Sequence, residues 1–217
     1  MEAFLKKYTN TSATSICICE PELHEIPPEV FEFRELESLI IMGGHVEFIP
    51  HEIAKLTKLK YLSIMGMNIK SIPPGIGQLT SLIMLFLSNN QITSLPDEIG
   101  NLRSLDILEI SGNQLQSIPQ SICRLRNLQS LSAFKNKIVS LPLEIGDLSS
   151  IRFMDFGDNL LRTLPPTLGN LTNLQHIRIR GNPITAIPPE IADKCIVGSE
   201  PTDWHEFISM LNKHLDS

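Results

Sequence analysis

The feature that most constrains this chain is a pattern that returns every 23 residues. The units begin at Ala13, Leu36, Leu59, Leu82, Leu105, Leu128, Ile151 and Leu174, so eight units fill residues 13–196 without an insertion or deletion. A fixed period of this size predicts a solenoid, in which each unit packs only against its neighbours and one continuous core runs through the stack.

Each unit combines a strand signal with a return segment, counting positions from the start of the unit. Positions 4 and 6 are apolar, as in Leu108 and Ile110, which predicts a short strand with one buried face. Position 15 is proline in all eight units, from Pro27 to Pro188. Proline cannot donate a ladder hydrogen bond, so the return segment should be extended and then make one short helical turn.

Position 9 is asparagine in the last five units: Asn90, Asn113, Asn136, Asn159 and Asn182. Asparagine tolerates turns and bonds loop backbone, so these side chains should stack as a ladder. The first three units carry Pro21, Gly44 and Met67 there, with Asn68 one place late as a candidate substitute. We therefore expect the N-terminal end to lack the ladder, to be less regular and to open more easily.

The pattern L-x-x-L-x-L-x-x-N-x-I-x-x-I-P-x-x-I-x-x-L-x-x resembles the leucine-rich repeat over residues 13–196. Its length is similar to the intracellular form associated with Ras-group proteins, a form that bacterial repeat proteins also use. The resemblance implies an α/β leucine-rich-repeat solenoid, a curved right-handed horseshoe with a parallel sheet on its concave face. It also suggests a small GTPase or a signalling phosphatase as a partner.

Both ends of a solenoid expose core and need covering. Residues 1–12 place Phe4, Leu5 and Tyr8 at helical spacing, which predicts an N-terminal capping helix. Residues 197–217 begin a second helix with a capping box at Asp203 and Glu206. An apolar stripe follows, formed by Trp204, Phe207, Ile208, Leu211 and Leu215. We expect it to cap the last repeat, the alternative being a helix that docks a partner.

The candidate binding surface is the concave face, because strand residues alternate faces and positions 3, 5 and 7 should point into the groove. Neighbouring strands lie about 4.8 Å apart, so the columns should form a surface about 34 Å long. We expect an exposed apolar field with charged side chains within it and a basic end: Ile40, Met42, Tyr61, Met65, Met84, Phe86, Ile107, Glu109, Phe134, Phe153, Asp155, His176, Arg178 and Arg180. A large exposed apolar patch usually marks a protein interface. The alternative is that curvature closes the groove and these side chains pack on one another.

Charge, hydropathy and cysteine content limit the kinds of partner and the cellular compartment that we expect. The net charge is −6 and no stretch is dense in lysine or arginine, which argues against nucleic acid and anionic membranes. The chain has no apolar run long enough to span a membrane and no signal-like N-terminus. Cys17 and Cys19 lie on one strand face, a poor geometry for a disulfide. We expect a cytoplasmic protein, with secretion into a host cell as an effector as the alternative.

Enzymatic, metal and cofactor chemistry are not expected. Ser132 and His176 should lie two strands apart, about 9–10 Å, too far for a nucleophile and its base, with Asp155 between them. The group Cys17, Cys19 and His24 lacks the second ligand pair of a zinc site.

The sequence therefore predicts a non-catalytic, monomeric protein-interaction module that binds a protein partner through its concave face, in small-GTPase or related signalling. Two alternatives stay open. One is a host-targeting effector of an intracellular bacterium, and the other is a structural adaptor that binds through its convex face or its C-terminal helix.

Overall fold

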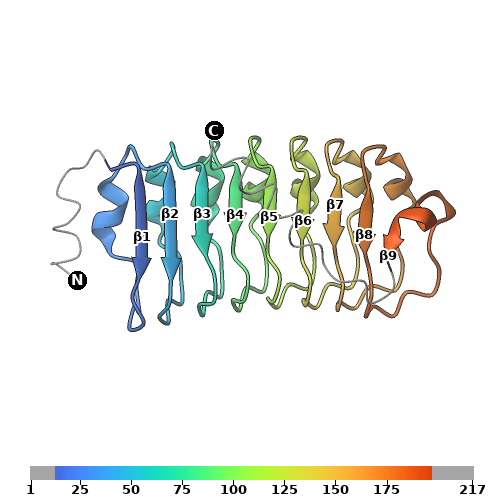
Figure 1. Ribbon diagram of the computed structural model, residues 1–217, viewed down its shortest axis with the longest axis horizontal. Helices are drawn as coiled ribbons and strands as arrows, with labels where there is room; N and C mark the ends of the chain where they lie inside the picture. The colour runs from blue at the N-terminus through green and yellow to red at the C-terminus, as the bar shows by residue number, and fades with distance from the viewer. Residues whose placement is uncertain (1–12, 197–217) are drawn as a thin grey trace.

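The structure, a computed structural model, describes residues 13–196. The two predicted capping helices, residues 1–12 and 197–217, lie outside the described residues. The strands form one nine-stranded parallel sheet in chain order (Figure 1). Their bounds are β1 Ser15–Cys19, β2 Ser38–Met42, β3 Tyr61–Ile64, β4 Met84–Phe86, β5 Ile107–Glu109, β6 Ser130–Ser132, β7 Phe153–Asp155, β8 His176–Arg178 and β9 Cys195–Ile196.

A short 3-10 helix follows the position-15 proline of every unit and lies behind the sheet (Figure 1). These helices are η2 Pro28–Glu32, η3 His51–Lys55, η4 Pro74–Gln78, η5 Asp97–Asn101, η6 Gln120–Arg124, η7 Leu143–Asp147, η8 Pro166–Asn170 and η9 Pro189–Lys194. The proline is extended and its carbonyl accepts the first bond of the turn, as when Ile76 N donates to Pro73 O at 3.0 Å. The predicted return segment is confirmed.

The strands pair in a register of one repeat. Met84 lies opposite Tyr61 on one side and Ile107 on the other, and the same offset of 23 residues joins every neighbouring pair from β1 to β8. Equivalent positions of successive units are therefore lateral neighbours, as the period predicts.

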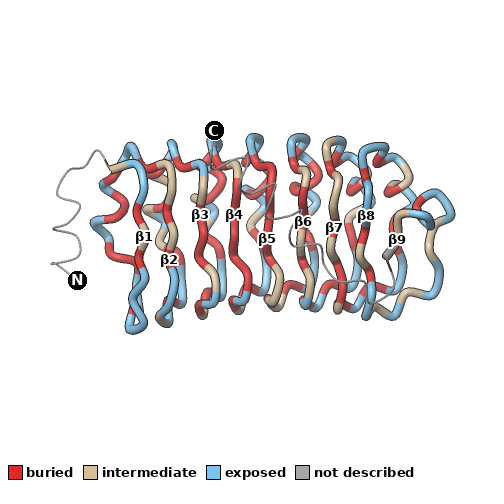
Figure 2. Tube along the Cα trace, viewed as in Figure 1, coloured by how far each residue is buried: buried red, intermediate tan, exposed pale blue. Residues whose placement is uncertain are grey.

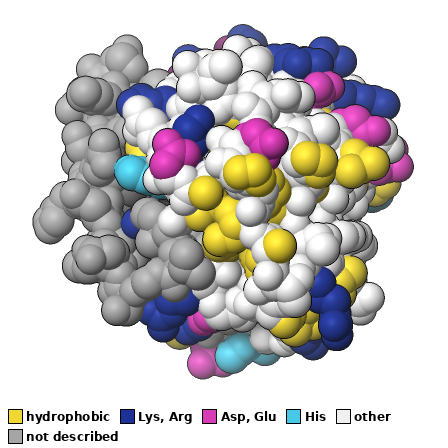
Figure 3. Space-filling model, turned by 90° about the vertical axis from the view of Figure 1, so that its right-hand side faces the viewer, with side chains coloured by type: hydrophobic (Ala, Val, Ile, Leu, Met, Phe, Trp, Pro, Cys, Tyr) yellow, Lys and Arg dark blue, Asp and Glu magenta, His cyan; other side chains and the backbone are white. Residues whose placement is uncertain are grey.

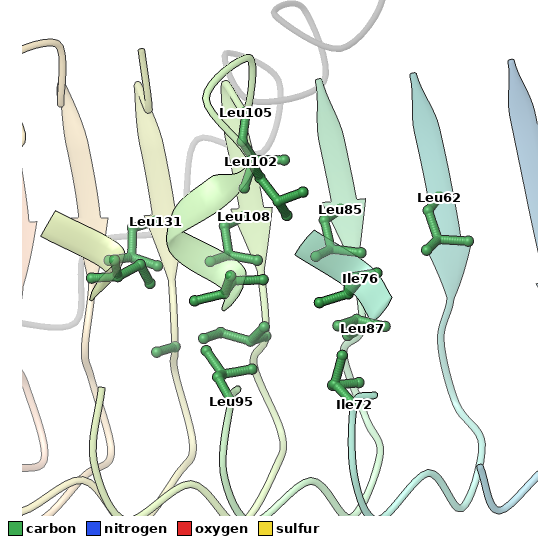
Figure 4. Close-up of a cluster of buried hydrophobic side chains, with 14 of the residues drawn as sticks. Leu62, Ile72, Ile76, Leu85, Leu87, Leu95, Leu102, Leu105, Leu108 and Leu131 are labelled. Atoms are coloured by element: carbon green, nitrogen blue, oxygen red, sulfur yellow. The ribbon is translucent and has the colours of Figure 1, made fainter. Parts of the chain in front are cut away.

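The main core lies between the sheet and the 3-10 helices. Leu62, Leu85, Leu108 and Leu131 at position 4 are all 0% exposed and form one row, and Ile76 and Leu87 lie beside Leu85 (Figure 4). Because each row continues through the stack, the repeats share one apolar cluster from Ile16 to Ile191.

The last unit ends in a ninth strand that the 23-residue pattern did not predict. Strand β9 is an extra strand, and Cys195 pairs with Ile177, only 18 residues earlier, because η9 leads directly into β9. Ile184 and Ile187 are only half-buried, although the equivalent residues of earlier units belong to the core. The end of the last repeat shows hydrophobic side chains gathered in its middle (Figure 3).

The asparagine ladder is present, and each asparagine side chain also bonds the backbone of the preceding unit. Asn136 Oδ1 accepts from Leu115 N at 3.0 Å, and its Nδ2 donates to Ile110 O and Ala133 O. The other four asparagines repeat this arrangement. Each amide therefore serves the loop of the preceding unit as well as its own.

The turn after the strand also needs a residue with positive φ, which was not among the sequence predictions. Position 8 has positive φ in seven units: Gly43, Gly66, Asn89, Gly112, Lys135, Asp158 and Gly181. The enrichment of glycine, asparagine and aspartate there is the signal that could have found it, since these residues tolerate the left-handed region best.

The N-terminal units lack the ladder, as predicted, but their sheet is not less regular. Strands β1 and β2 pair over five residues, whereas β4 to β8 have three residues each. Asn68 does not replace a ladder residue: its Oδ1 accepts from the Gln91 side chain at 3.0 Å. Easier opening of this end stays a prediction.

Candidate protein-recognition surface

The concave columns are aligned as the repeat predicts, and the structure brings the candidate residues onto one face of the sheet. Ile40, Ser63, Phe86, Glu109, Ser132, Asp155 and Arg178 form one continuous row across β2 to β8. The predicted site residues therefore lie on neighbouring strands of a single surface.

The expected exposure of the centre of this surface is wrong. Met84, Phe86 and Ile107 are 3%, 5% and 0% exposed, and they form an apolar cluster separate from the main core. Tyr61, Met65 and Ile83 pack against it, and Tyr61 and Phe86 lie with ring centroids 5.4 Å apart. In Figure 2 β4 and β5 are buried throughout. We call Met84, Phe86 and Ile107 the groove cluster.

Glu109 beside the groove cluster is also buried, and not exposed as expected. Ser88 Oγ donates to Glu109 Oε1 at 2.7 Å, and Ser111 N donates to the same oxygen at 2.9 Å. A buried carboxylate needs such donors. Glu109 therefore organises the strand ends of β4 and β5 in this structure.

The two ends of the concave face are more open. At the N-terminal end Ile40 is half-buried and Met42 is 42% exposed. At the other end His176 and Arg180 are exposed, while Phe134, Phe153 and Arg178 are half-buried. The surface thus has a buried apolar centre between an apolar end and a basic end.

Asp155 and Arg178 form the expected ion pair, with Asp155 Oδ2 and Arg178 Nη1 3.8 Å apart. Burial raises the pKa of the Asp155 carboxyl, while the Gly157 N–H that it accepts at 2.9 Å and the Arg178 charge act in the opposite direction. Burial also raises the pKa of the Tyr61 hydroxyl.

The side chains considered for catalysis are engaged in other contacts. Ser132 Oγ is paired with Ser111 Oγ at 2.8 Å, and the His176 ring lies 6.0 Å from the Phe153 ring. In the described part of the chain, no group of three histidine, cysteine or acidic residues could hold a metal ion.

All four cysteines are free thiols, and Cys17 Sγ and Cys19 Sγ are 3.3 Å apart. Burial raises the pKa of Cys123 to about 11, which makes this thiol unreactive near neutrality. Between residues 13 and 196 no helix is long and apolar enough to cross a membrane.

The sequence matches two repeat families. Residues 84–154 match a model described as a leucine-rich repeat region, and residues 173–195 match the Leucine Rich Repeat model. No protein of curated function matches the chain in sequence.

Two solved structures share the fold. A leucine-rich-repeat protein of Leptospira interrogans is 22% identical with a TM-score of 0.62, and covers 93% of this chain and 66% of its own. An internalin of Listeria monocytogenes is 20% identical with a TM-score of 0.69, and covers 88% of this chain and 62% of its own. The chain thus matches just under two thirds of each of these proteins.

Proposed function

We propose that this chain is a leucine-rich-repeat protein, as its matches to two repeat models suggest, and that it is a non-catalytic module that binds a protein partner through its concave face. The observation that carries the proposal is the accessible part of the concave face beside the groove cluster, where Met42 is exposed and Ile40, Tyr61 and Met65 are half-buried. Aromatic and methionine side chains are the usual anchors of protein interfaces.

The character of the partner follows from the two ends of the groove. Arg178 and Arg180 offer positive charge, while Met42 and Ile40 offer apolar surface. We infer a partner that presents apolar surface to one end of the groove and an acidic patch to the other. The resemblance to the Ras-group repeat class makes a small GTPase or a signalling phosphatase the first candidate.

Three further parts of the proposal come from the sequence. The protein acts in the cytoplasm, supported by its four free thiols, and it acts as a monomer. It has no catalytic step of its own. The host-targeting effector uses the same surface, so a secretion assay, not a binding assay, separates it from the signalling module.

The convex face is the weaker candidate surface. The large exposed apolar side chains outside the groove are Phe48, Val139, Leu143 and Leu160, which occupy four different positions of the repeat. Single exposed apolar residues are normal on a soluble protein. Substitutions of these residues therefore supply a matched control for substitutions in the groove.

The test compares affinity purification by wild type, a Tyr61→Ser/Met42→Ser variant and a Leu143→Ser/Val139→Ser variant, followed by direct binding with the purified partner. We expect the groove variant to lose about 2 kcal/mol of binding, about 30-fold in Kd, and the convex variant to bind normally. Loss of binding in the convex variant alone would assign the function to the other face.

A further inference from the structure

Two cysteines and a methionine lie on neighbouring strands at the N-terminal end of the concave face. In β1, Cys17 and Cys19 alternate with Ile16 and Ile18, which are buried in the main core, so both thiols lie on the opposite, concave side. Cys19 pairs with Met42 of β2 in the register of the sheet. Because β1 is the first strand, these three side chains lie at one end of the groove (Figure 1).

The two thiols are in contact and accessible. Cys17 Sγ and Cys19 Sγ are 3.3 Å apart, Cys19 is exposed and Cys17 is half-buried. Met42 on the neighbouring strand is 42% exposed. Within residues 13–196 none of the three belongs to the main core or to the groove cluster. Packing of the fold therefore does not explain why three sulfur side chains share this place.

A disulfide is a poor use of the cysteine pair. Two residues apart in an extended strand, the Cα atoms are about 6.6 Å from each other, near the upper limit for a disulfide. A metal ion shared by two thiolates asks for a wider spacing, about 4 Å between sulfurs at metal–sulfur bonds of about 2.3 Å. The exposed Cys19 side chain provides it by moving its sulfur less than about 1 Å.

The donor atoms select the kind of ion. Between residues 13 and 196 no three histidine, cysteine or acidic residues come together, so the four ligands of a zinc site are missing there. Thiolate and thioether sulfur are soft donors that select Cu(I), whose filled d shell accepts a small number of sulfur ligands. Ile40 lies opposite Cys17 in the sheet, and its apolar side chain limits the access of water to such an ion.

We propose that Cys17, Cys19 and Met42 form a binding site for a single Cu(I) ion. Each thiol that bonds to the ion releases its proton to solvent, so the bound group consists of two thiolates and one thioether. Neither the ion nor the sulfur changes its oxidation state. The unbranched Met42 side chain reaches the ion from the next strand, about 4.8 Å away.

The next methionine in the same column serves a different purpose. Met65 follows β3 one repeat after Met42, but it is half-buried and packs against the groove cluster. Met42 is thus the methionine of this column that is free to bind an ion, and Met65 supplies a matched control for it.

This inference goes beyond the proposed function, because binding of Cu(I) requires no protein partner. It is measured on the purified chain alone, so failure of either proposal leaves the other standing.

The experiment titrates the full chain with Cu(I) under anaerobic, reducing conditions, in competition with a chromogenic Cu(I) chelator. We expect wild type to hold one ion per chain. Loss of an outer-shell partner alone costs about 10–100-fold in metal affinity, so Cys17→Ser/Cys19→Ser should weaken binding by more than about 100-fold. Met42→Leu keeps an apolar side chain but removes one sulfur donor, and should weaken binding about 10-fold.

Two control variants keep the proposed ligands. Cys123→Ala/Cys195→Ala removes the other thiols of the chain, and Met65→Leu removes the neighbouring thioether. Both should bind Cu(I) as tightly as wild type. X-ray absorption at the copper edge should show sulfur neighbours and no nitrogen or oxygen.

Cu(I) binding that survives in Cys17→Ser/Cys19→Ser would overturn the proposal, and so would its loss in the variant that lacks Cys123 and Cys195. Met42→Leu guards against misfolding, since the Met42 side chain is exposed, and unchanged affinity there would overturn the three-sulfur site. Zn(II) held as tightly as Cu(I) by wild type would contradict the choice of ion.

Discussion

The first three units and the five that follow share one period but join their neighbours differently. Units one to three pair through longer strands and carry exposed ion pairs one repeat apart: Lys55 with Glu32, Lys58 with Glu35, Lys60 with Glu37 and Lys70 with Glu47. The later units carry the buried asparagine ladder. The 23-residue period thus fixes the geometry of the stacked units, while the polar interactions between neighbouring units differ along the stack.

The difference has an energetic consequence. Exposed ion pairs contribute about 0–1 kcal/mol each, whereas a buried amide that loses its partners costs about 1–3 kcal/mol. We therefore expect the central units to resist opening more than the N-terminal ones, although the apolar core is continuous through both. Four experiments, with seven substitutions between them, test this contrast.

The largest effect should come from the shared core. Leu108→Ala in the centre and Leu39→Ala near the N-terminus both remove side chains that are 0% exposed. Each should cost about 2–5 kcal/mol, because a buried cavity replaces the lost contacts. Urea unfolding with both variants would measure this. A much smaller loss at Leu39 would show that the N-terminal core, and not only its polar connections, is weaker.

Gly44→Ala should cost about 2–4 kcal/mol. Gly44 has φ +87°, and an added Cβ would lie 2.4 Å from Leu23 O. Gly66→Ala is the matched control, since its φ is +69° but nothing lies within 4 Å of the added Cβ. Thermal unfolding of both variants separates the steric clash from the strained φ. Equal losses would show that the close contact of the first two units is unimportant.

Asn136→Ala should cost about 1–3 kcal/mol, because Leu115 N and Ile110 O would lose their partner in a buried loop. Asn68→Ala should cost far less, since the Asn68 side chain is half-buried and its amide oxygen only accepts from Gln91. Hydrogen exchange in the two loops would show where protection is lost. A neutral result at Asn136 would contradict a stabilising ladder.

Lys60→Ala should have the smallest effect, about 0–0.5 kcal/mol, because the Lys60 and Glu37 side chains are 52% and 44% exposed. Denaturant midpoints at low and high salt would measure it, and any loss should shrink as salt screens the pair. A loss of more than 1 kcal/mol would show that an N-terminal ion pair stabilises the fold about as much as a ladder asparagine.

The sequence predicted which candidate site residues lie side by side, but it did not predict which of them are buried. The period placed Tyr61, Met84 and Ile107 side by side, and the structure pairs them in that order. No local pattern separates Met84, which is buried, from Met42, which is exposed. Met84 packs with Phe86 and Ile107 in the groove cluster, and Met42 is not part of that cluster.

By itself the sequence determined the parallel sheet, its register, the proline-led turns and the asparagine ladder. It could do so because each unit interacts with its nearest neighbour, so a repeated residue becomes a repeated contact. Only the tertiary structure decided the ninth strand at Cys195, the backward reach of Asn136 and the burial of the groove cluster. The ninth strand depends on where the repeat stops. The other two features depend on side-chain contacts that the 23-residue period alone does not specify.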